Sequence, residues 1–166
     1  MTTYVAVVGP GDDAAAADCA DAREVGRLLA AAGVVVGTGG LGGVLAAAAA
    51  GAASAGGVSV GLLPGDDRSA AAASLTVALP TGLGELRNAL VVRAADAVVA
   101  IGGSWGTLSE VALAARAGTP VVAIRGWTLM DGGGVDRSVE AMWTPREAVD
   151  RVLAVAGSAP EHPTSG

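Results

Sequence analysis

Short runs of apolar, mostly β-branched residues alternate along the chain with longer stretches rich in Ala and Leu. A short continuous apolar run is typical of a strand buried on both sides, and a longer periodic stretch is typical of a helix. Strands are therefore predicted over 4–9, 34–39, 58–64, 75–80, 97–102, 120–125 and, as a short last strand, 139–143. Helices are predicted over 14–33, 42–57, 83–94, 107–117 and 144–157, and loops over 65–74 and 126–138. This alternation predicts an α/β, Rossmann-like doubly wound parallel sheet of about six or seven strands with helices on both faces.

The last predicted helix marks the end of the predicted domain. It begins with Thr144 at the N-cap, Pro145 at the first position and Glu147 at the third, which together form a complete helix-start signal. The residues after 157 continue no such pattern. We therefore expect residues 1–157 to form a single nucleotide-binding domain and residues 158–166 to form a disordered tail.

Composition excludes several kinds of chemistry. The chain has 166 residues and a net charge of −6 without basic runs, which argues against nucleic-acid binding. It contains no Lys, so a P-loop lysine and a Schiff-base site are both impossible. Its one cysteine, Cys19, cannot form an internal disulfide, and its one histidine, His162, lies in the predicted tail. We expect no metal ion and no cofactor, and chemistry that depends on Arg, Asp, Glu, Ser, Thr and backbone amides.

The sequence shows neither a signal peptide nor a membrane-spanning segment. Its start, "MTTYVAVVG", lacks the basic region of a signal peptide and leads directly into a strand pattern. The Ala-rich run 44–55 is too short and too closely flanked by glycine to span a membrane. A cytoplasmic protein without membrane contact is expected.

Three glycine-rich turns each follow a predicted strand and precede a predicted helix. They are "GPGDD" (9–13), "GTGGLGG" (37–43) and "GGSWGT" (102–107). Such a turn exposes backbone N–H groups at the positive end of a helix and can hold an anion, although each can also be only a tight turn. The second turn has no acidic residue about twenty residues further on in a strand position, which argues against NAD binding. In a doubly wound sheet the ligand lies beyond the carboxyl ends of the strands, where these turns are placed.

The third turn allows two interpretations. Thr107 and Glu110 have the spacing of a capping box, in which their side chains would only complete the start of a helix. Alternatively, the hydroxyls of Ser104 and Thr107, beside exposed amides and Trp105, form a cradle for phosphate. Arg87 also allows two interpretations. It can be a partner of the third glycine turn, or it can be a surface arginine whose stem packs on the neighbouring leucines.

Read as one segment, "TGLGELRNALVVRAADAVVAIGGSWGTLSE" (81–110) resembles the LOG (Lonely Guy) family of Rossmann-like nucleotide-binding proteins. The hallmark of that family is an Arg-bearing helix followed by a strand that ends in P-G-G-x-G-T-x-x-E, and "GTGGLGGVLAAAAAGA" resembles its first glycine turn. The resemblance implies that Arg87 and Glu110 form the catalytic pair. It implies a phosphate- or nucleotide-binding site made of Gly102, Gly103, Ser104, Gly106, Thr107, Gly39, Gly40 and Gly43.

Two positions depart from the family pattern. Asn88 stands where the family usually has Lys, and Ile101 stands where it usually has Pro. The variant resembles a side branch of the family that includes molybdenum-cofactor carrier proteins. The departures bear on catalysis more than on binding.

The resemblance implies one leading function and one alternative. The first is a phosphoribohydrolase of the cytokinin-activating type, which cleaves the N-glycosidic bond of a nucleoside 5′-monophosphate; Glu110 would stabilise the positive charge that develops on the ribose. The alternative is a non-catalytic carrier of a phosphorylated pterin or a nucleotide. In both cases the partner is a small phosphorylated ligand, and the resemblance also implies a homodimer or a higher even oligomer. The small-residue helices 42–55 and 107–117 offer faces for such an association.

Overall fold

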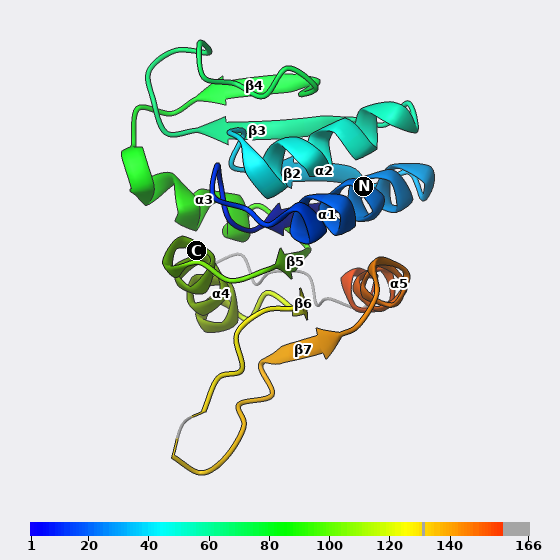
Figure 1. Cartoon of the computed structure of the whole chain (residues 1–166), viewed down its shortest axis with the longest axis vertical. Helices are drawn as coiled ribbons and strands as arrows, with labels where there is room; N and C mark the ends of the chain where they lie inside the picture. The colour runs from blue at the N-terminus through cyan, green and yellow to red at the C-terminus, as the bar shows by residue number, and fades with distance from the viewer. Residues whose placement is uncertain (131, 158–166) are drawn as a thin grey trace.

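The computed structural model describes residues 1–130 and 132–157, and its centre is one parallel sheet (Figure 1). The sheet has seven strands in the order β4-β3-β2-β1-β5-β6-β7, and every neighbouring pair is parallel. The strands are β1 (Tyr4–Val8), β2 (Val35–Thr38), β3 (Ser59–Leu63), β4 (Val77–Pro80), β5 (Ala97–Ile101), β6 (Val121–Ile124) and β7 (Val139–Met142). Each lies within a predicted range, so the predicted doubly wound α/β fold is confirmed. The predicted tail, with His162, lies outside the described residues.

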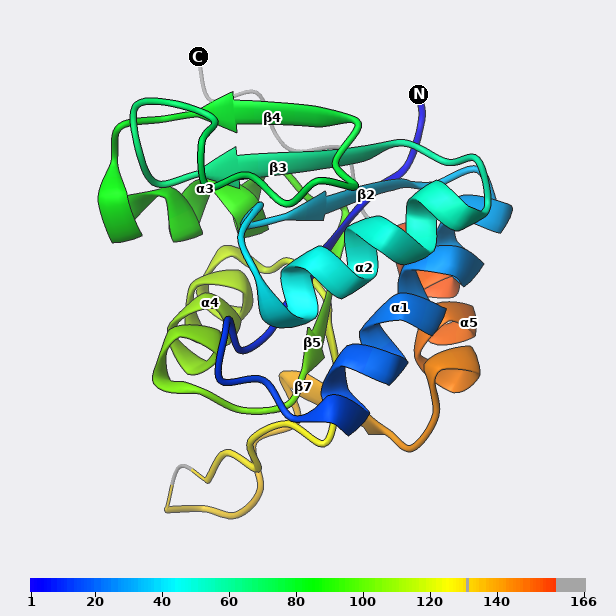
Figure 2. The ribbon, with the colours of Figure 1, turned by 45° about the horizontal axis from the view of Figure 1, so that its top comes forward.

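Helices cover both faces of the sheet, as Figure 2 shows. One face carries α1 (Ala16–Ala31), α2 (Gly43–Ser54) and α5 (Pro145–Ala156), and the other carries α3 (Arg87–Arg93) and α4 (Trp105–Ala117). The predicted helix 83–94 is divided into a 3-10 turn, η1 (Gly84–Leu86), and α3. The capping box of Thr144 and Glu147 at the start of α5 is present as predicted.

The core consists of small aliphatic side chains from both faces. Along β1, Val5 and Val7 belong to the cluster under α1, α2 and α5, whereas Ala6 and Val8 belong to the cluster under α3 and α4. This alternation follows from the two-residue period of a strand. Every residue of β5 is buried, as expected for a central parallel strand.

Helices α1 and α2 approach each other at backbone distance. A Cβ atom added to Gly26 would overlap the carbonyl oxygen of Ala48, and one added to Gly51 would overlap that of Arg23. The small-residue face of α2 is therefore used within the chain, against α1, and is not left free for a second subunit.

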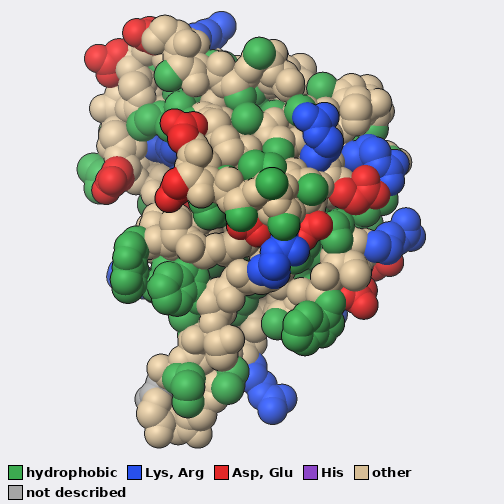
Figure 3. Space-filling view, viewed as in Figure 1, with side chains coloured by type: hydrophobic (Ala, Val, Ile, Leu, Met, Phe, Trp, Pro, Cys, Tyr) green, Lys and Arg blue, Asp and Glu red, His purple; other side chains and the backbone are tan. Residues whose placement is uncertain are grey.

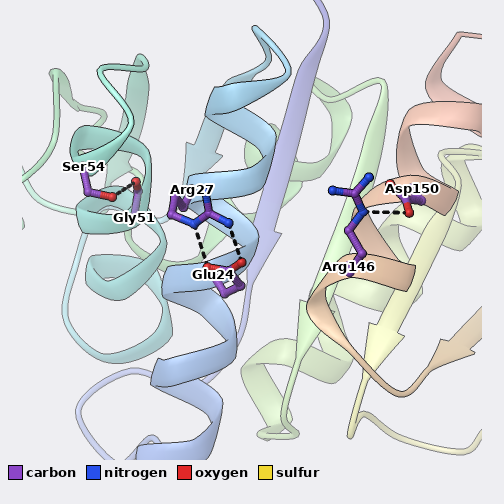
Figure 4. A network of polar contacts seen from close by, with 6 residues as sticks. All are labelled: Glu24, Arg27, Gly51, Ser54, Arg146 and Asp150. Carbon is purple, nitrogen blue, oxygen red and sulfur yellow. Dashed lines mark hydrogen bonds and ion pairs between the residues drawn. The ribbon is translucent and has the colours of Figure 1, made fainter.

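The outer surfaces of these helices carry exposed polar contacts (Figure 4). Arg27 pairs with Glu24 on α1, and Arg146 pairs with Asp150 on α5. Exposed pairs of this kind contribute at most about 1 kcal/mol each, so packing and not surface charge holds the fold. Within the described residues, no helix combines the length and the apolar character that crossing a bilayer requires.

The strand order defines where a ligand site is expected. After β1 the chain continues to β2 on one side, whereas β5, on the other side of β1, continues to β6 and β7. The direction in which successive strands are added to the sheet therefore reverses between β1 and β5. The connections that follow these two strands lead to opposite halves of the sheet. Turns 9–13 and 102–107 consequently lie at the carboxyl edge of the sheet, where a fold of this kind places its ligand.

Candidate functional site

The first two glycine turns, 9–13 and 37–43, are in direct backbone contact. The carbonyl oxygen of Pro10 accepts a hydrogen bond from the backbone N–H of Val44, in the first turn of α2. A Cβ atom on Gly43, which has φ of 61°, would overlap the carbonyl oxygen of Gly11. The start of α2 is therefore occupied in part by the chain itself, and Gly43 has a structural reason to be glycine.

The third turn begins its helix earlier than the sequence pattern suggested. Ser104 is the N-cap of α4, and its Oγ accepts a hydrogen bond of 3.1 Å from the backbone N–H of Thr107. The capping-box interpretation of Thr107 and Glu110 is therefore wrong, because Thr107 is the third residue of α4 and Glu110 lies in its second turn. Glu110 therefore has no capping role, and another interaction must account for its burial.

The third turn still presents free amides at the positive end of α4. The first N–H groups of an α-helix have no acceptor within the helix. The N–H of Thr107 is satisfied by Ser104, whereas those of Trp105 and Gly106 are the first two of the helix. Gly102 and Gly103 lead into this turn from β5. The structure thus places Gly102, Gly103, Ser104, Gly106 and Thr107 together between the end of β5 and the first turn of α4.

Arg87 and Glu110 form a buried pair beside these turns. Arg87 comes from the junction of η1 and α3, Glu110 comes from α4, and Nη1 lies 3.8 Å from Oε1. Their side chains are only 8% and 6% exposed. The reading of Arg87 as a surface arginine is therefore wrong. The Nε atom of Arg87 is buried and has no hydrogen-bond partner.

The second glycine turn makes room for this arginine. A Cβ atom on Gly39 would lie 2.5 Å from Nη1 of Arg87, so the guanidinium rests directly against the backbone. Gly40 follows with its N–H bonded to the hydroxyl of Thr38. The turn 37–43, Arg87 and Glu110 therefore form one connected structure, although they lie far apart in sequence.

Burial controls the charge of the pair. Removal from water raises the pKa of Glu110 to about 7, and the nearby positive charge of Arg87 offsets only part of that effect. Burial also lowers the pKa of Arg87, against the opposing influence of Glu110. Near neutral pH, Glu110 is therefore divided between its ionised and protonated forms while Arg87 stays charged.

Glu110 is expected to make the protein less stable as the pH rises. Its pKa of about 7 in the folded chain exceeds the ordinary value of 4.5, so the folded state binds more protons between these values. The free energy of unfolding then falls as the pH rises through that interval. Glu110→Gln removes this titration, and urea unfolding measured between about pH 5 and about pH 8 is expected to show a flatter slope.

A matched control is available on β7. The hydrogen bond that Arg151 donates to Glu140 lowers the pKa of Glu140, so this group titrates below the interval that Glu110 controls. Glu140→Gln is expected to leave the slope unchanged. Equal slopes in wild type and Glu110→Gln would contradict the assignment.

Sequence reasoning missed a second set of residues around the third turn. Asp18 of α1 lies against Gly102, whose added Cβ atom would lie 2.5 Å from Oδ2. Arg125, at the end of β6, pairs with Asp18 at 2.9 Å and with Asp21 at 2.6 Å. Arg125 is the one non-glycine residue with positive φ, 51°, in the described part of the chain. Strained backbone of this kind concentrates at functional sites.

Tryptophan also contributes to this turn from a distant segment. Trp127 lies with its ring centre 5.2 Å from that of Trp105, and its Nε1 donates a hydrogen bond to the carbonyl oxygen of Ser104. Trp105 was singled out in the sequence as a large aromatic residue within a glycine turn, whereas no sequence signal pointed to Trp127. Across residues 1–130 and 132–157, no three His, Cys, Asp or Glu side chains group in a way that could hold a metal ion.

The parallel sheet, with its strand order reversing beside a glycine turn, defines a Rossmann-like α/β protein. Residues 2–155 match the model of the SLOG cluster4 family, a group of LOG-like proteins, and the chain belongs to this family. An uncharacterized protein of Archaeoglobus fulgidus is 38% identical over 133 residues, which are 80% of this chain and 83% of that protein.

Two solved structures are similar over almost their whole length. The molybdenum cofactor binding protein of Rippkaea orientalis has a TM-score of 0.85 and 30% identity, covering 93% of this chain and 98% of that one. The molybdenum cofactor carrier protein of Chlamydomonas reinhardtii has a TM-score of 0.84 and 31% identity, covering 95% and 99%. The predicted resemblance to the molybdenum-cofactor carrier branch of the family is thus confirmed by similarity in structure.

Proposed function

We propose that this protein binds a phosphorylated pterin of the molybdenum-cofactor type in the cytoplasm and carries it without cleaving it. Two proteins whose names state that they bind or carry this cofactor are similar over nearly the whole chain. The observation that carries the proposal is this similarity, at 30% and 31% identity over nearly the full length of both chains.

The ligand phosphate is proposed to bind at the start of α4. The N–H groups of Trp105 and Gly106 and the dipole of a helix of 13 residues favour an anion there. The charge of Arg87, beside the adjoining turn, supplies a permanent positive group in a chain whose net charge is −6. Gly102, Gly103, Ser104 and Thr107 would complete the cradle, and Gly39, Gly40 and Gly43 would form the neighbouring wall.

A phosphoribohydrolase is the second candidate, and the position of Glu110 favours it. Its carboxyl group lies one turn inside the helix whose first amides would hold the phosphate. If ligand binding ionises Glu110, its carboxylate would stabilise the oxocarbenium-like state of the ribose. The two candidates therefore differ in the charge of one side chain when ligand is bound.

A paired assay separates them. The protein is titrated calorimetrically with neopterin monophosphate, AMP and inorganic phosphate, and the same nucleotides are incubated while free base is measured. The carrier proposal expects binding of the pterin phosphate without release of base from any nucleoside monophosphate. Release of base by wild type, lost in Glu110→Gln, would establish the hydrolase instead.

We also propose that the protein forms a homodimer or a higher even oligomer. Leu83, Leu86 and Leu90, on and beside η1 and α3, are exposed although apolar. Leu86 and Trp105 line a hollow of about 470 Å³ between α3 and α4. Clustered exposed apolar side chains are typical of interaction surfaces.

Leu86→Glu is expected to convert the oligomer to a monomer, because the charge would be buried in the apolar contact. Light scattering at micromolar concentration measures the mass of wild type and variant. Val58→Glu is the control, since Val58 is exposed next to β3 at the amino end of the sheet. A monomeric wild type would contradict the oligomer.

A further inference from the structure

A second hollow adjoins the third glycine turn. It has a volume of about 230 Å³ and lies between the carboxyl ends of β6 and β7 and the loop over 126–130 and 132–138. Its lining includes the apolar or aromatic residues Trp127, Leu129, Val135, Val139, Met142 and Trp143. Sites for whole drug-sized ligands measure roughly 300–1,000 Å³, so the hollow suits one part of a ligand.

Tryptophan is concentrated at this edge of the molecule. The chain has three Trp, one Tyr and no Phe. Trp105 begins α4, Trp127 follows β6, and Trp143 directly follows β7, so none of the three is used in the core. Trp143 is 88% exposed. A chain that places all its tryptophans at the carboxyl edge of its sheet, with one of them open to solvent, offers a surface for stacking a ring.

Trp127 connects the hollow to the proposed phosphate cradle. It lines the hollow, and its Nε1 also donates to the carbonyl oxygen of Ser104, the N-cap of α4. Gly103 lies against the same indole, since an added Cβ atom would be 3.1 Å from Nε1. The cradle and the hollow therefore share Trp127 as a common wall.

Arg125 joins the lining of the hollow to α1. Arg125 lines the hollow and has a positive φ of 51° directly after β6, two residues before Trp127. Its guanidinium is fixed by Asp18 and Asp21 of α1. In Figure 3 the loop projects from the body of the molecule, and hydrophobic side chains lie on both sides of its base.

We propose that this hollow is the ring subsite of the carrier, which takes the fused heteroaromatic ring of the ligand whose phosphate lies at the start of α4. The proposal rests on the proposed function for the identity of the ligand. Trp143 provides the stacking surface, and the remaining lining excludes water from the ring. Stacking of an aromatic side chain on a heterocyclic base contributes roughly 1–3 kcal/mol.

Trp143→Ala tests the subsite. Calorimetric titration is expected to show an affinity for neopterin monophosphate reduced by roughly tenfold, with the affinity for inorganic phosphate unchanged. Because Trp143 is exposed, its removal leaves the fold intact. Val58→Ala, at the opposite end of the sheet, is the control and is expected to bind both compounds as wild type does. Unchanged binding of neopterin monophosphate by Trp143→Ala, or an equal loss for both compounds, would overturn the subsite.

A second measurement keeps this test separate from that of the proposed function. Unphosphorylated neopterin and adenosine are added at millimolar concentration while the indole N–H signals are followed by NMR. Shifts of the Trp127 and Trp143 signals support a ring subsite even if no phosphate is bound by the protein. Indole signals that stay unchanged with every ring compound would overturn the subsite, whatever is found for phosphate.

Discussion

Replacing Gly43 with alanine is expected to lower the free energy of unfolding by about 3 kcal/mol or more. Two costs add at this position. The backbone has φ of 61°, which L side chains rarely adopt, and the new methyl group would overlap the carbonyl oxygen of Gly11. Since that atom belongs to backbone, it cannot move aside without displacing the first glycine turn. Urea unfolding followed by circular dichroism measures the loss.

Gly33→Ala separates the two costs. Gly33 has a similar φ of 76°, but no heavy atom lies within 4 Å of an added Cβ. The backbone cost alone, roughly 1–2 kcal/mol, is expected there. Equal losses of unfolding free energy in the two variants would show that the backbone contact between turns 9–13 and 37–43 adds no cost.

The second large effect is expected for Arg87→Met on ligand binding. Methionine fills a similar apolar volume but removes the charge and every donor, so the affinity for neopterin monophosphate should fall by roughly thirtyfold or more. The fold is expected to persist, because Glu110, whose pKa is already about 7, takes up a proton when its positive neighbour is lost. Calorimetric titration measures the affinity.

Arg93→Met provides the matched control on the same helix. Arg93 is exposed in the last turn of α3, and its loss removes the same charge without opening the buried pair. We expect binding close to that of wild type. If both variants lose affinity equally, the effect is one of overall charge, and Arg87 has no specific place in the site.

Most of the fold was predictable because its elements carry local signals. Buried parallel strands are continuous apolar runs, and each of the seven was found inside its predicted range. The start of α5 was predicted to the residue, since Thr144, Pro145 and Glu147 all act on one turn. The helix 83–94 was mispredicted as continuous; in the structure Gly84, with φ of 55°, begins a separate 3-10 turn.

The site was less predictable because its contacts join distant segments. Ser104 and Thr107 both precede an apolar run, and local spacing alone did not show which one caps the helix. The approach of Arg87 to Gly39 depends on how α3 crosses the sheet, which no local pattern contains. The resemblance of segment 81–110 named Arg87 and Glu110, whereas the contact of Asp18 with Gly102 had no sequence signal beyond one acidic residue early in a helix.

The backbone-distance contact of α1 and α2 determines how this protein tolerates change over evolution. At Gly26 and Gly51 the backbones of the two helices touch and no side chain remains to be shortened. Enlargement is damaging instead, because a single added carbon at either position meets a carbonyl oxygen of the other helix. Random mutagenesis of α1 and α2 should therefore reject Gly→Ala at these two positions as strongly as it rejects shortening of the fully buried Val25, Leu29 and Val44, where the loss of packed volume is costly. Among related sequences, we therefore expect these two positions to stay glycine while the exposed charged positions of the same helices vary.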